Sequence, residues 1–399
     1  MQYHALALAA SGVEVDLVGL TGTALSTRIT SNPAITVRRI QPSLVRAKSR
    51  GGLAYAAAAV VDAVRVSWRL RRALAPIENA TLVIVQNPPA FPTLAVTWSV
   101  LRRRGVRFVI DWHNIGYTLL RRRLGGWHPA VRLARWYERR DAERVDANLA
   151  VSRGLAAFLE SRFGVKGARV LYDRPAAAFA PMDRGERERF RQALFGRLGI
   201  VGSTAGFIIC PSSWTEDEDF DVVIDAVQRL EERIRGWEAG GAGRRFPHLI
   251  ILVTGDGARR VEFERRFAGL QTRRVQLRAR WLDPEEYPRV VGSADLGLCL
   301  HRSSSGLDIP MKVADLFGAG VPVCALDYGA CLAERVRHGD NGLLFSTARQ
   351  LADILFDLFE TYPHDQAALE RLRAGARKSA RPTWEEGWVL EARSLLLGR

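Results

Sequence analysis

Lysine and cysteine are both scarce in this chain of 399 residues. Only four of its 58 basic side chains are lysines, so arginine carries nearly all of the positive charge. The four cysteines are widely spaced and form no C-x-x-C pair: Cys210, Cys299, Cys324 and Cys331. This spacing excludes a dense disulfide framework and a zinc module, and it is typical of a reducing compartment.

Long apolar runs are also lacking. The longest uncharged run, 79–101, is divided by Gln86, Asn87 and three prolines into a strand-like piece and a helix-like piece. Residues 1–10 have neither a basic start nor a small-residue cleavage site. The sequence therefore predicts no transmembrane helix and no signal peptide.

The positive charge is distributed unevenly. The net charge is +15, and the first 175 residues hold 27 basic against 11 acidic side chains. A basic half predicts an anionic partner, which would be a phosphate-bearing substrate, a nucleic acid or an anionic membrane face. Arginine-rich codon usage is an alternative explanation for much of this excess. No nucleic-acid motif is present, so we expect no nucleic-acid partner.

Short β-branched runs alternate with helical patterns through both halves of the chain. A loop rich in Gly, Ser, Asp or Pro follows each run, and a helix follows the loop, as over 54–74 and 130–144. This alternation predicts βαβ units and two doubly wound parallel sheets, with the seam between Asp173 and Thr204. The expected strands are 13–20, 82–85, 106–111, 147–151, 207–210, 249–254, 275–277, 296–300 and 321–325.

The motif with the most chemistry is 301–315, between two expected strands of the second half. Its serines and Gly306 form a polar turn whose backbone N–H groups could approach an anion, and Pro310 favours a helix start just after it. Lys312 and Asp315 are spaced for one face of that helix, where they could meet a phosphate and the hydroxyls of a ribose. The alternative is an ordinary strand–loop–helix with a solvated Lys–Asp pair.

A second motif, 210–220, follows another expected strand. Ser212, Ser213 and Thr215 supply hydroxyl groups, and the acidic run 216–219 favours a helix start. Such a run is more often a solvated first turn than an acid/base site. The glycine turn 254–257 is weak evidence by itself.

In the first half, His113 directly follows an expected strand and is flanked by Asp111 and Asn114. Histidine side chains ordinarily have a pKa near neutrality, which suits proton transfer or a hydrogen bond to a sugar hydroxyl. The alternative is a structural histidine whose hydrogen bonds are made to its own neighbours. The turn that begins at Gln86 and Asn87 caps another strand in a similar way.

At these motifs the chain resembles the chitobiosyldiphosphodolichol β-mannosyltransferase family. The matching strings are QNPPAFPTLAV, IDWHNIGY, SSWTEDEDF, WLDPEEYPRVVGSADLGLCLHRSSSGLDIPMKVADLFGAGVPVCAL and HGDNGLLF, and the terminal string TWEEGW also fits. The resemblance implies an α/β GT-B fold, in which two Rossmann-like domains face each other across a cleft. It also implies GDP-mannose as donor, dolichyl-diphosphate-linked chitobiose as acceptor, an inverting reaction that forms a β-1,4 bond, and the cytosolic face of the endoplasmic reticulum membrane.

The resemblance also implies roles for the residues singled out above. His113 is the first candidate for the general base, and Glu216 and Glu218 are the second. The acceptor side would include four residues: Gln86, Asn87, Asp111 and Asn114. The donor side would include Ser212, Ser213, Thr215, Gly255, Trp281, His301, Ser303, Ser304, Ser305, Gly306, Lys312 and Asp315. We expect no tightly bound metal or cofactor and leave stimulation by Mg²⁺ open.

The resemblance further implies that residues 1–180 form the acceptor- and membrane-facing domain and that 181–375 form the donor domain. We expect residues 376–399 to form a terminal helix that packs toward the first domain. The chain begins inside a helix that family members place after a first strand, so we expect that strand to be missing here. Helices over 54–72 and 93–104 are expected at a membrane surface. Later mannosyltransferases of the pathway are further expected partners. The alternatives are another GT-B enzyme with a different nucleotide sugar and lipid acceptor, and a truncated, non-catalytic form that binds a membrane surface.

Overall fold

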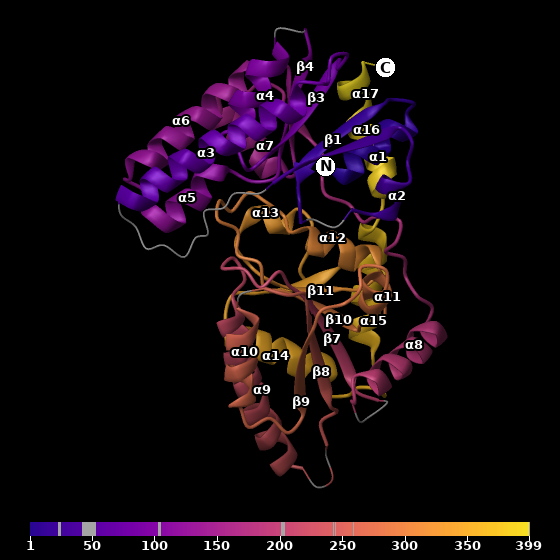
Figure 1. The fold of residues 1–399 in the computed structure, drawn as a ribbon. Helices are drawn as coiled ribbons and strands as arrows, with labels where there is room; N and C mark the ends of the chain where they lie inside the picture. The colour runs from indigo at the N-terminus through magenta and orange to yellow at the C-terminus, as the bar shows by residue number, and fades with distance from the viewer. Residues whose placement is uncertain are drawn as a thin grey trace. The chain divides into compact units, whose positions relative to one another are not determined.

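The computed structural model describes residues 1–22, 25–41, 53–102, 105–200, 204–241, 243, 245–257 and 259–398, with the backbone alone for 53–60. The chain divides into an N-terminal unit, formed by Met1–Tyr172 and Trp388–Arg399, and a C-terminal unit, formed by Asp173–Gly387 (Figure 1). The first division falls before the expected boundary at residue 180. The reason is that the segment after Asp173 packs in the C-terminal unit, where Phe179 contacts Tyr287 with ring centroids 5.7 Å apart.

The C-terminal unit is built on one six-stranded sheet in the order β12-β11-β10-β7-β8-β9, in which every neighbouring pair is parallel. The central strands are fully buried, as a sheet covered on both faces requires. The strands are β7 (Gly206–Pro211), β8 (Leu249–Thr254), β9 (Val275–Arg280), β10 (Leu296–Cys299), β11 (Val323–Leu326) and β12 (Gly342–Phe345).

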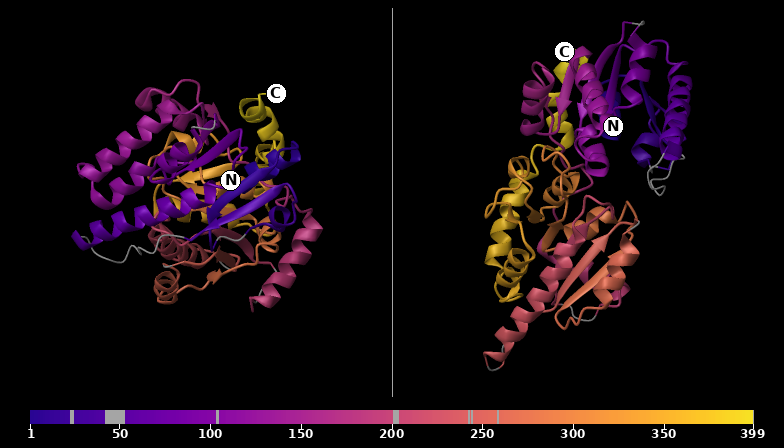
Figure 2. Two further views of the ribbon diagram at one scale, coloured as in Figure 1. Left: turned by 45° about the horizontal axis from the view of Figure 1, so that its top comes forward. Right: turned by 90° about the vertical axis from the view of Figure 1, so that its left-hand side faces the viewer.

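Two hydrophobic layers form on opposite faces of this sheet, because successive side chains of a strand alternate between faces. Ile208 of β7 packs in the layer covered by α9 and α14, and Ile209 packs in the layer covered by α8, α11 and α12. Figure 2 shows helices along both faces of the sheet. The helices are α8 (Arg184–Arg197), α9 (Phe220–Ala239), α10 (Arg260–Ala268), α11 (Tyr287–Gly292), α12 (Met311–Gly318), α13 (Ala330–Ala333), α14 (Ala348–Phe359) and α15 (Ala367–Ser379).

The N-terminal unit contains two parallel sheets, one with the order β1-β2 and one with the order β3-β4-β5-β6. The strands are β1 (Val15–Leu20), β2 (Ile35–Ile40), β3 (Leu82–Asn87), β4 (Arg107–Trp112), β5 (Ala147–Ala150) and β6 (Arg169–Val170). The helices of the first 172 residues are α1 (Gln2–Ala10), α2 (Thr27–Thr30), α3 (Leu53–Leu74), α4 (Thr93–Leu101), α5 (Gly116–Leu124), α6 (Pro129–Arg144) and α7 (Arg153–Phe163).

The C-terminal segment differs from the single helix expected over 376–399. It comprises the end of α15, then α16 (Trp384–Glu391), which crosses the division after Gly387, and α17 (Arg393–Leu397). Within the described residues, no helix is both long and apolar enough to cross a membrane.

Helix α4 corrects the expectation that 93–104 lies at a membrane surface. Leu94, Val96 and Leu101 are buried, and Val96 packs against Leu70 and Leu74 of α3. The apolar residues of α4 therefore belong to the core of the unit. Residues 103 and 104 lie outside the described part of the chain.

Candidate active site

The candidate donor site lies at the topological switch point of the C-terminal sheet. From the central strand β7 the chain continues through β8 to β9 on one side, and β10, β11 and β12 follow on the other. In open α/β sheets, ligands bind beyond the carboxyl ends of the strands at such a point. The loop after β7 contains the motif 212–219, and the loop after β10 together with the start of α12 contains the motif 301–312. The order of the strands therefore brings these motifs together.

Glu218 is central to the contacts between the two loops. It is 2% exposed, and its Oε1 forms an ion pair with Nζ of Lys312. Its Oε2 accepts hydrogen bonds from the Ser212 hydroxyl at 2.8 Å and from the N–H groups of Ser213 at 3.0 Å and Thr215 at 3.4 Å. Both carboxylate oxygens are thus engaged. This arrangement disfavours Glu218 as a general base and suits a residue that positions Lys312.

Two unusual backbone positions shape the 212–218 loop. Trp214 is 1% exposed and has a φ of +53°, a left-handed conformation that is rare outside glycine. Its indole stacks on the ring of Phe220, and the ring centroids are 4.6 Å apart. Gly255 has a φ of +92°, and a Cβ atom there would lie 2.0 Å from the carbonyl oxygen of Ser212. The close approach of the turn after β8 therefore requires glycine. Contact of Gly255 with a donor stays a prediction.

His301 connects the same loops through two carboxylates. Its Nδ1 lies 3.2 Å from Asp217, and its Nε2 lies 2.8 Å from Asp308. Burial alone would lower the pKa of the imidazole, but its hydrogen bonds to the two carboxylates raise the pKa from 6.5 to about 9. His301 is therefore cationic at neutral pH. Sequence reasoning assigned no individual role to either carboxylate. Asp217 lies next to His301 because β7 and β10 are neighbours in the sheet, whereas Asp308 belongs to the same loop as His301.

The serine turn after β10 differs from the expected anion-binding turn. The Ser303 hydroxyl accepts a hydrogen bond from the N–H group of Gly306 at 2.7 Å, and the Ser305 hydroxyl accepts one from the N–H group of Leu307 at 3.0 Å. Serine side chains compete for nearby backbone donors in this way. Two N–H groups of the turn are thus satisfied within the turn, and an anion would depend on others, such as those in the first turn of α12.

Asp315 lies one turn beyond Lys312 on α12, as its spacing predicted. Burial, with a further contribution from Asp173, raises the pKa of the Asp315 carboxyl from 3.8 to about 7, against an opposing effect of Lys312. Trp281, at the end of the edge strand β9, is 59% exposed, and Glu216 is exposed in the loop after β7. The roles of these residues stay predictions.

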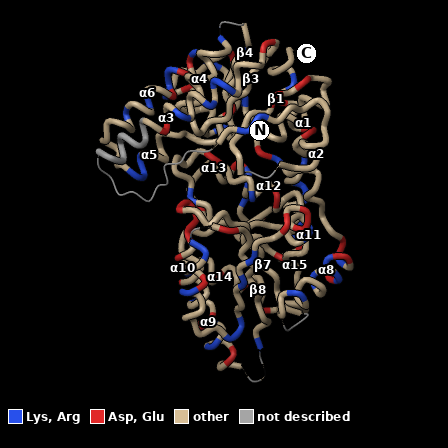
Figure 3. The backbone as a smooth tube through the Cα atoms, in the orientation of Figure 1, with Lys and Arg blue, Asp and Glu red and all other residues tan. Residues whose placement is uncertain are grey.

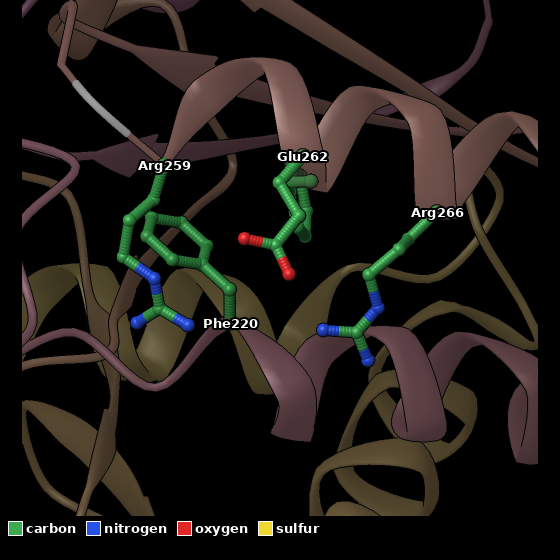
Figure 4. Close-up of a pocket in the computed structure, with 5 residues that line it drawn as sticks. Phe220, Arg259, Glu262 and Arg266 are labelled. Carbon is green, nitrogen blue, oxygen red and sulfur yellow. The ribbon is translucent and has the colours of Figure 1, made fainter.

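A small surface hollow beside the loop after β7 is lined by Phe220 of α9, by Arg259 just before α10 and by residues of α10 (Figure 4). A guanidinium N–H group of Arg259 donates to the backbone carbonyl of Glu218 at 3.1 Å, and the Arg259 guanidinium lies over the Phe220 ring. Arg266 forms an ion pair with Asp221. These contacts fasten α10 to the start of α9 and thereby support the position of Glu218.

In the N-terminal unit, a chain of polar groups holds His113 at the end of β4. Its Nε2 lies 2.8 Å from Oδ2 of Asp111, and Nε2 of His4 lies 3.2 Å from the same oxygen. The indole N–H group of Trp388 donates to Nδ1 of His4 at 3.1 Å, so we assign the His4 proton to Nε2, facing Asp111. Although burial alone would raise it, the two histidines hold the pKa of Asp111 well below its usual range.

Asn87 and Asn114 have structural partners near His113. The Asn87 amide is buried and donates to Glu138 at 3.0 Å, and Glu138 also accepts the N–H groups of Gly116 at 2.8 Å and Tyr117 at 3.0 Å. The buried Glu138 thus caps the start of α5. The Asn114 side chain accepts the N–H group of Ile115 at 2.7 Å. Contacts of Gln86, Asn87 and Asn114 with an acceptor stay predictions.

Sequence reasoning missed His4, Glu138 and Trp388. Glu138 lies among arginines in α6, where an exposed ion pair is the usual expectation, and nothing local indicates that it is buried. Trp388 belongs to the terminal string TWEEGW, but its contact with His4 spans almost the whole chain. In the described part of the chain, no group of three or more His, Cys, Asp or Glu side chains is arranged to hold a metal ion.

Comparison with known proteins assigns the chain to a family. Residues 2–173 match the family described as "Glycosyl transferase 4-like domain", and residues 206–361 match the one described as "Glycosyl transferases group 1". The "Chitobiosyldiphosphodolichol beta-mannosyltransferase" of Mus musculus is 34% identical over 417 residues, which cover 97% of this chain and 84% of the mouse protein. The chain belongs to the chitobiosyldiphosphodolichol beta-mannosyltransferase family. The expected resemblance is confirmed, and so is glycosyltransferase activity with a nucleotide-sugar donor.

One further relative and one solved structure extend the comparison. "UDP-glycosyltransferase TURAN" of Arabidopsis thaliana is 34% identical, with 99% of this chain and 94% of that protein covered. WaaG, a glycosyltransferase involved in lipopolysaccharide biosynthesis, has a TM-score of 0.63 at 16% identity, over 100% of this chain and 95% of its own. That likeness concerns the fold alone. Together with the matched domains, it confirms that this member of the chitobiosyldiphosphodolichol beta-mannosyltransferase family has the GT-B fold.

Proposed function

We propose that the protein transfers mannose from GDP-mannose to dolichyl-diphosphate-linked chitobiose and forms a β-1,4 bond with inversion. The observation that carries this proposal is the ion pair between the buried Glu218 and the partly exposed Lys312 at the switch point of the donor-side sheet. It places a cation at the start of α12, beyond the carboxyl ends of β7 and β10. The names of the mouse relative and others supply the sugar and the acceptor.

On the donor side, Lys312 and the first N–H groups of α12 would stabilise the negative charge that develops on the departing diphosphate. Asp315, one turn farther along the helix, would accept hydrogen bonds from the ribose hydroxyls. Ser303, Ser304 and Ser305 would line the diphosphate, with His301 holding their turn through Asp308. Trp281 would lie against the guanine.

On the acceptor side, His113 would be the general base. In one displacement, the 4-hydroxyl oxygen of the terminal sugar bonds to C1 of mannose, its proton passes to His113, and the C1–O bond breaks with its electron pair leaving on GDP. A carboxylate behind an imidazole orients the ring and stabilises its protonated form. Asp111 is placed for this task at 2.8 Å.

The proposed setting is the cytosolic face of the endoplasmic reticulum membrane, since the proposed acceptor is a lipid. Later mannosyltransferases of the same pathway are proposed neighbours.

The test offers the purified protein chitobiosyl lipid with GDP-mannose, UDP-N-acetylglucosamine or UDP-glucose, with and without Mg²⁺. We expect product with GDP-mannose alone among the donors, and a β-linkage by NMR. The control is Lys312→Met, which should remove turnover while the protein stays folded. Turnover of a UDP-sugar in place of GDP-mannose would overturn the donor assignment. It would favour the second candidate, a UDP-dependent transferase, which the name of the Arabidopsis relative supports.

A further inference from the structure

His4 of α1 lies beside the carboxylate that supports the candidate base. Its Nε2 is 3.2 Å from Oδ2 of Asp111, and Nε2 of His113 is 2.8 Å from the same oxygen. The two imidazoles approach this carboxylate from different elements, since His4 lies in the first turn of α1 and His113 directly follows β4. The mechanism proposed above uses Asp111 and His113 and leaves His4 without a role.

The exposure of the two histidines separates what each can do. The side chain of His113 is 24% exposed, whereas those of His4 and Asp111 are each 3% exposed. A sugar hydroxyl could therefore reach His113 but not His4. His4 can act in the reaction only through Asp111, as a positioning residue and not as a second base.

Trp388 determines which nitrogen of His4 carries the proton. Its indole N–H group can only donate a hydrogen bond, and it lies 3.1 Å from Nδ1 of His4, so Nδ1 is the acceptor. The proton of the ring is then on Nε2, which faces Asp111. His4 is thus a neutral donor toward the carboxylate, and it adds no positive charge beside His113.

A neutral donor at this place weakens the stabilisation that Asp111 gives to a proton on His113. Burial alone would raise the pKa of Asp111, but His113 and, after it, His4 lower that pKa well below its usual range. The carboxylate is therefore ionised and faces two ring N–H groups. With His113 as its single partner it would stabilise the imidazolium form more strongly. Less of the protein would then have a neutral His113 that can accept a proton.

The other charged groups on the elements around this carboxylate are few. Helix α1 contains no Lys, Arg, Asp or Glu (Figure 3). Arg107 lies at the opposite end of β4, and Glu138 of α6 is engaged by Asn87 and by N–H groups at the start of α5. In α16, Glu391 is half-buried one turn after Trp388. All of these groups are the same in wild type and in a variant at position 4.

We propose that His4 is a positioning residue: as a neutral donor it shares the Asp111 carboxylate with His113. It thereby keeps His113 able to accept a proton near neutral pH. The inference rests on the proposed function in one respect, which is that His113 is the base. The sharing of Asp111 is a property of the folded protein and can be measured without substrate.

The first measurement is histidine-selective ¹⁵N NMR of the full chain without substrate, in which His4→Met and His113→Gln assign the two ring signals by their loss. In wild type we expect the His4 ring to stay neutral, with its proton on Nε2, while His113 titrates. In His4→Met the titration midpoint of His113 should rise by about half a pH unit or more, because a donor to Asp111 is lost. His4→Gln places a side chain of similar size that keeps an N–H group, so it should return the midpoint toward the wild-type value.

The second measurement is the pH dependence of kcat with GDP-mannose and the chitobiosyl lipid. In His4→Met the rising limb should move to higher pH by the same interval. At neutral pH kcat should then fall about threefold or more, while the KM for GDP-mannose stays unchanged. A merely structural role would lower kcat alike at every pH. A shifted NMR midpoint with an unshifted kinetic profile would refute His113 as the base, whereas the sharing of Asp111 would stand.

Two results would overturn the proposal, and both come from the NMR measurement. One is a His113 midpoint that is the same in wild type, His4→Met and His4→Gln. The other is a wild-type His4 ring that is protonated on both nitrogens, or on Nδ1 alone, while His113 titrates. The second result needs no variant, so it decides the question even where His4→Met does not fold.

Discussion

His301 leads to a quantitative prediction about stability and pH. The imidazole lies between Asp217 and Asp308, at 3.2 Å and 2.8 Å, and these carboxylates raise its pKa from 6.5 to about 9 despite burial. Because the folded-state pKa is the higher one, the cation stabilises the fold fully below pH 6.5. That stabilisation is lost as the pH rises through about 9.

The size of the effect follows from the shift. A pKa rise from 6.5 to about 9, at about 1.4 kcal/mol per pKa unit, corresponds to about 3 kcal/mol of folding free energy. The lowered pKa of Asp217 describes the same interaction from the side of its partner, so it is not added. Such a change is a large part of the stability of an ordinary domain.

The assay can isolate the C-terminal unit. All four cysteines are buried there, so a short pulse of thiol reagent in urea, analysed by mass spectrometry, reports unfolding of that unit. We expect wild type to lose about 3 kcal/mol relative to His301→Gln between pH 6.5 and pH 9. The variant His364→Gln, at an exposed histidine of the same unit, should follow wild type. Parallel pH curves for wild type and His301→Gln would refute the reasoning.

Four further predictions concern the two candidate sites. Lys312→Met should weaken GDP binding about tenfold or more in calorimetry, because a charge-assisted hydrogen bond is lost. Unchanged affinity would show that Lys312 does not contact the diphosphate. Glu218→Gln should strengthen GDP binding, because Lys312 loses the carboxylate that competes with the diphosphate for its ammonium group, and weaker binding would contradict this competition. Affinity for GDP should rise as the pH rises through about 7, where the Asp315 carboxyl ionises, and Asp315→Asn should flatten that profile. Asp111→Asn should lower kcat about a hundredfold or more with unchanged GDP affinity, and a normal kcat would exclude its support of His113.

Local pattern was sufficient to predict most of the fold. Runs of β-branched and apolar residues predict strands such as β7 and β8. Periodic apolar residues predict α3 and α6, with bounds close to those observed. The missed strands were β2, β6 and β12, which are short or mix arginine with apolar residues. The prediction that α4 lies at a membrane surface is wrong, because a periodic apolar stripe does not show whether protein or lipid covers it.

The candidate site was less predictable, because its contacts join residues that are far apart in the sequence. The sequence motifs identify Lys312, Glu218 and His301 as candidate site residues, but each one separately and without its contacts. The pairing of Lys312 with Glu218 depends on β10 lying next to β7, which no local pattern states. The contact between Trp388 and His4 likewise depends on residues from both ends of the chain folding into one unit.

The charges around Lys312 constrain how a diphosphate binds at the donor site. Lys312 and His301 are each matched by carboxylates, and with Glu218, Asp217 and Asp308 the cluster is net negative at neutral pH. A diphosphate would be repelled unless one cation turns toward it. His301 is held from both ring nitrogens, whereas Lys312 has a flexible stem, and Glu218 would keep its hydrogen bonds from the 212–215 loop after Lys312 leaves. Lys312 is therefore the group that can exchange a carboxylate for a phosphate, and Glu218 holds it in place until the donor arrives.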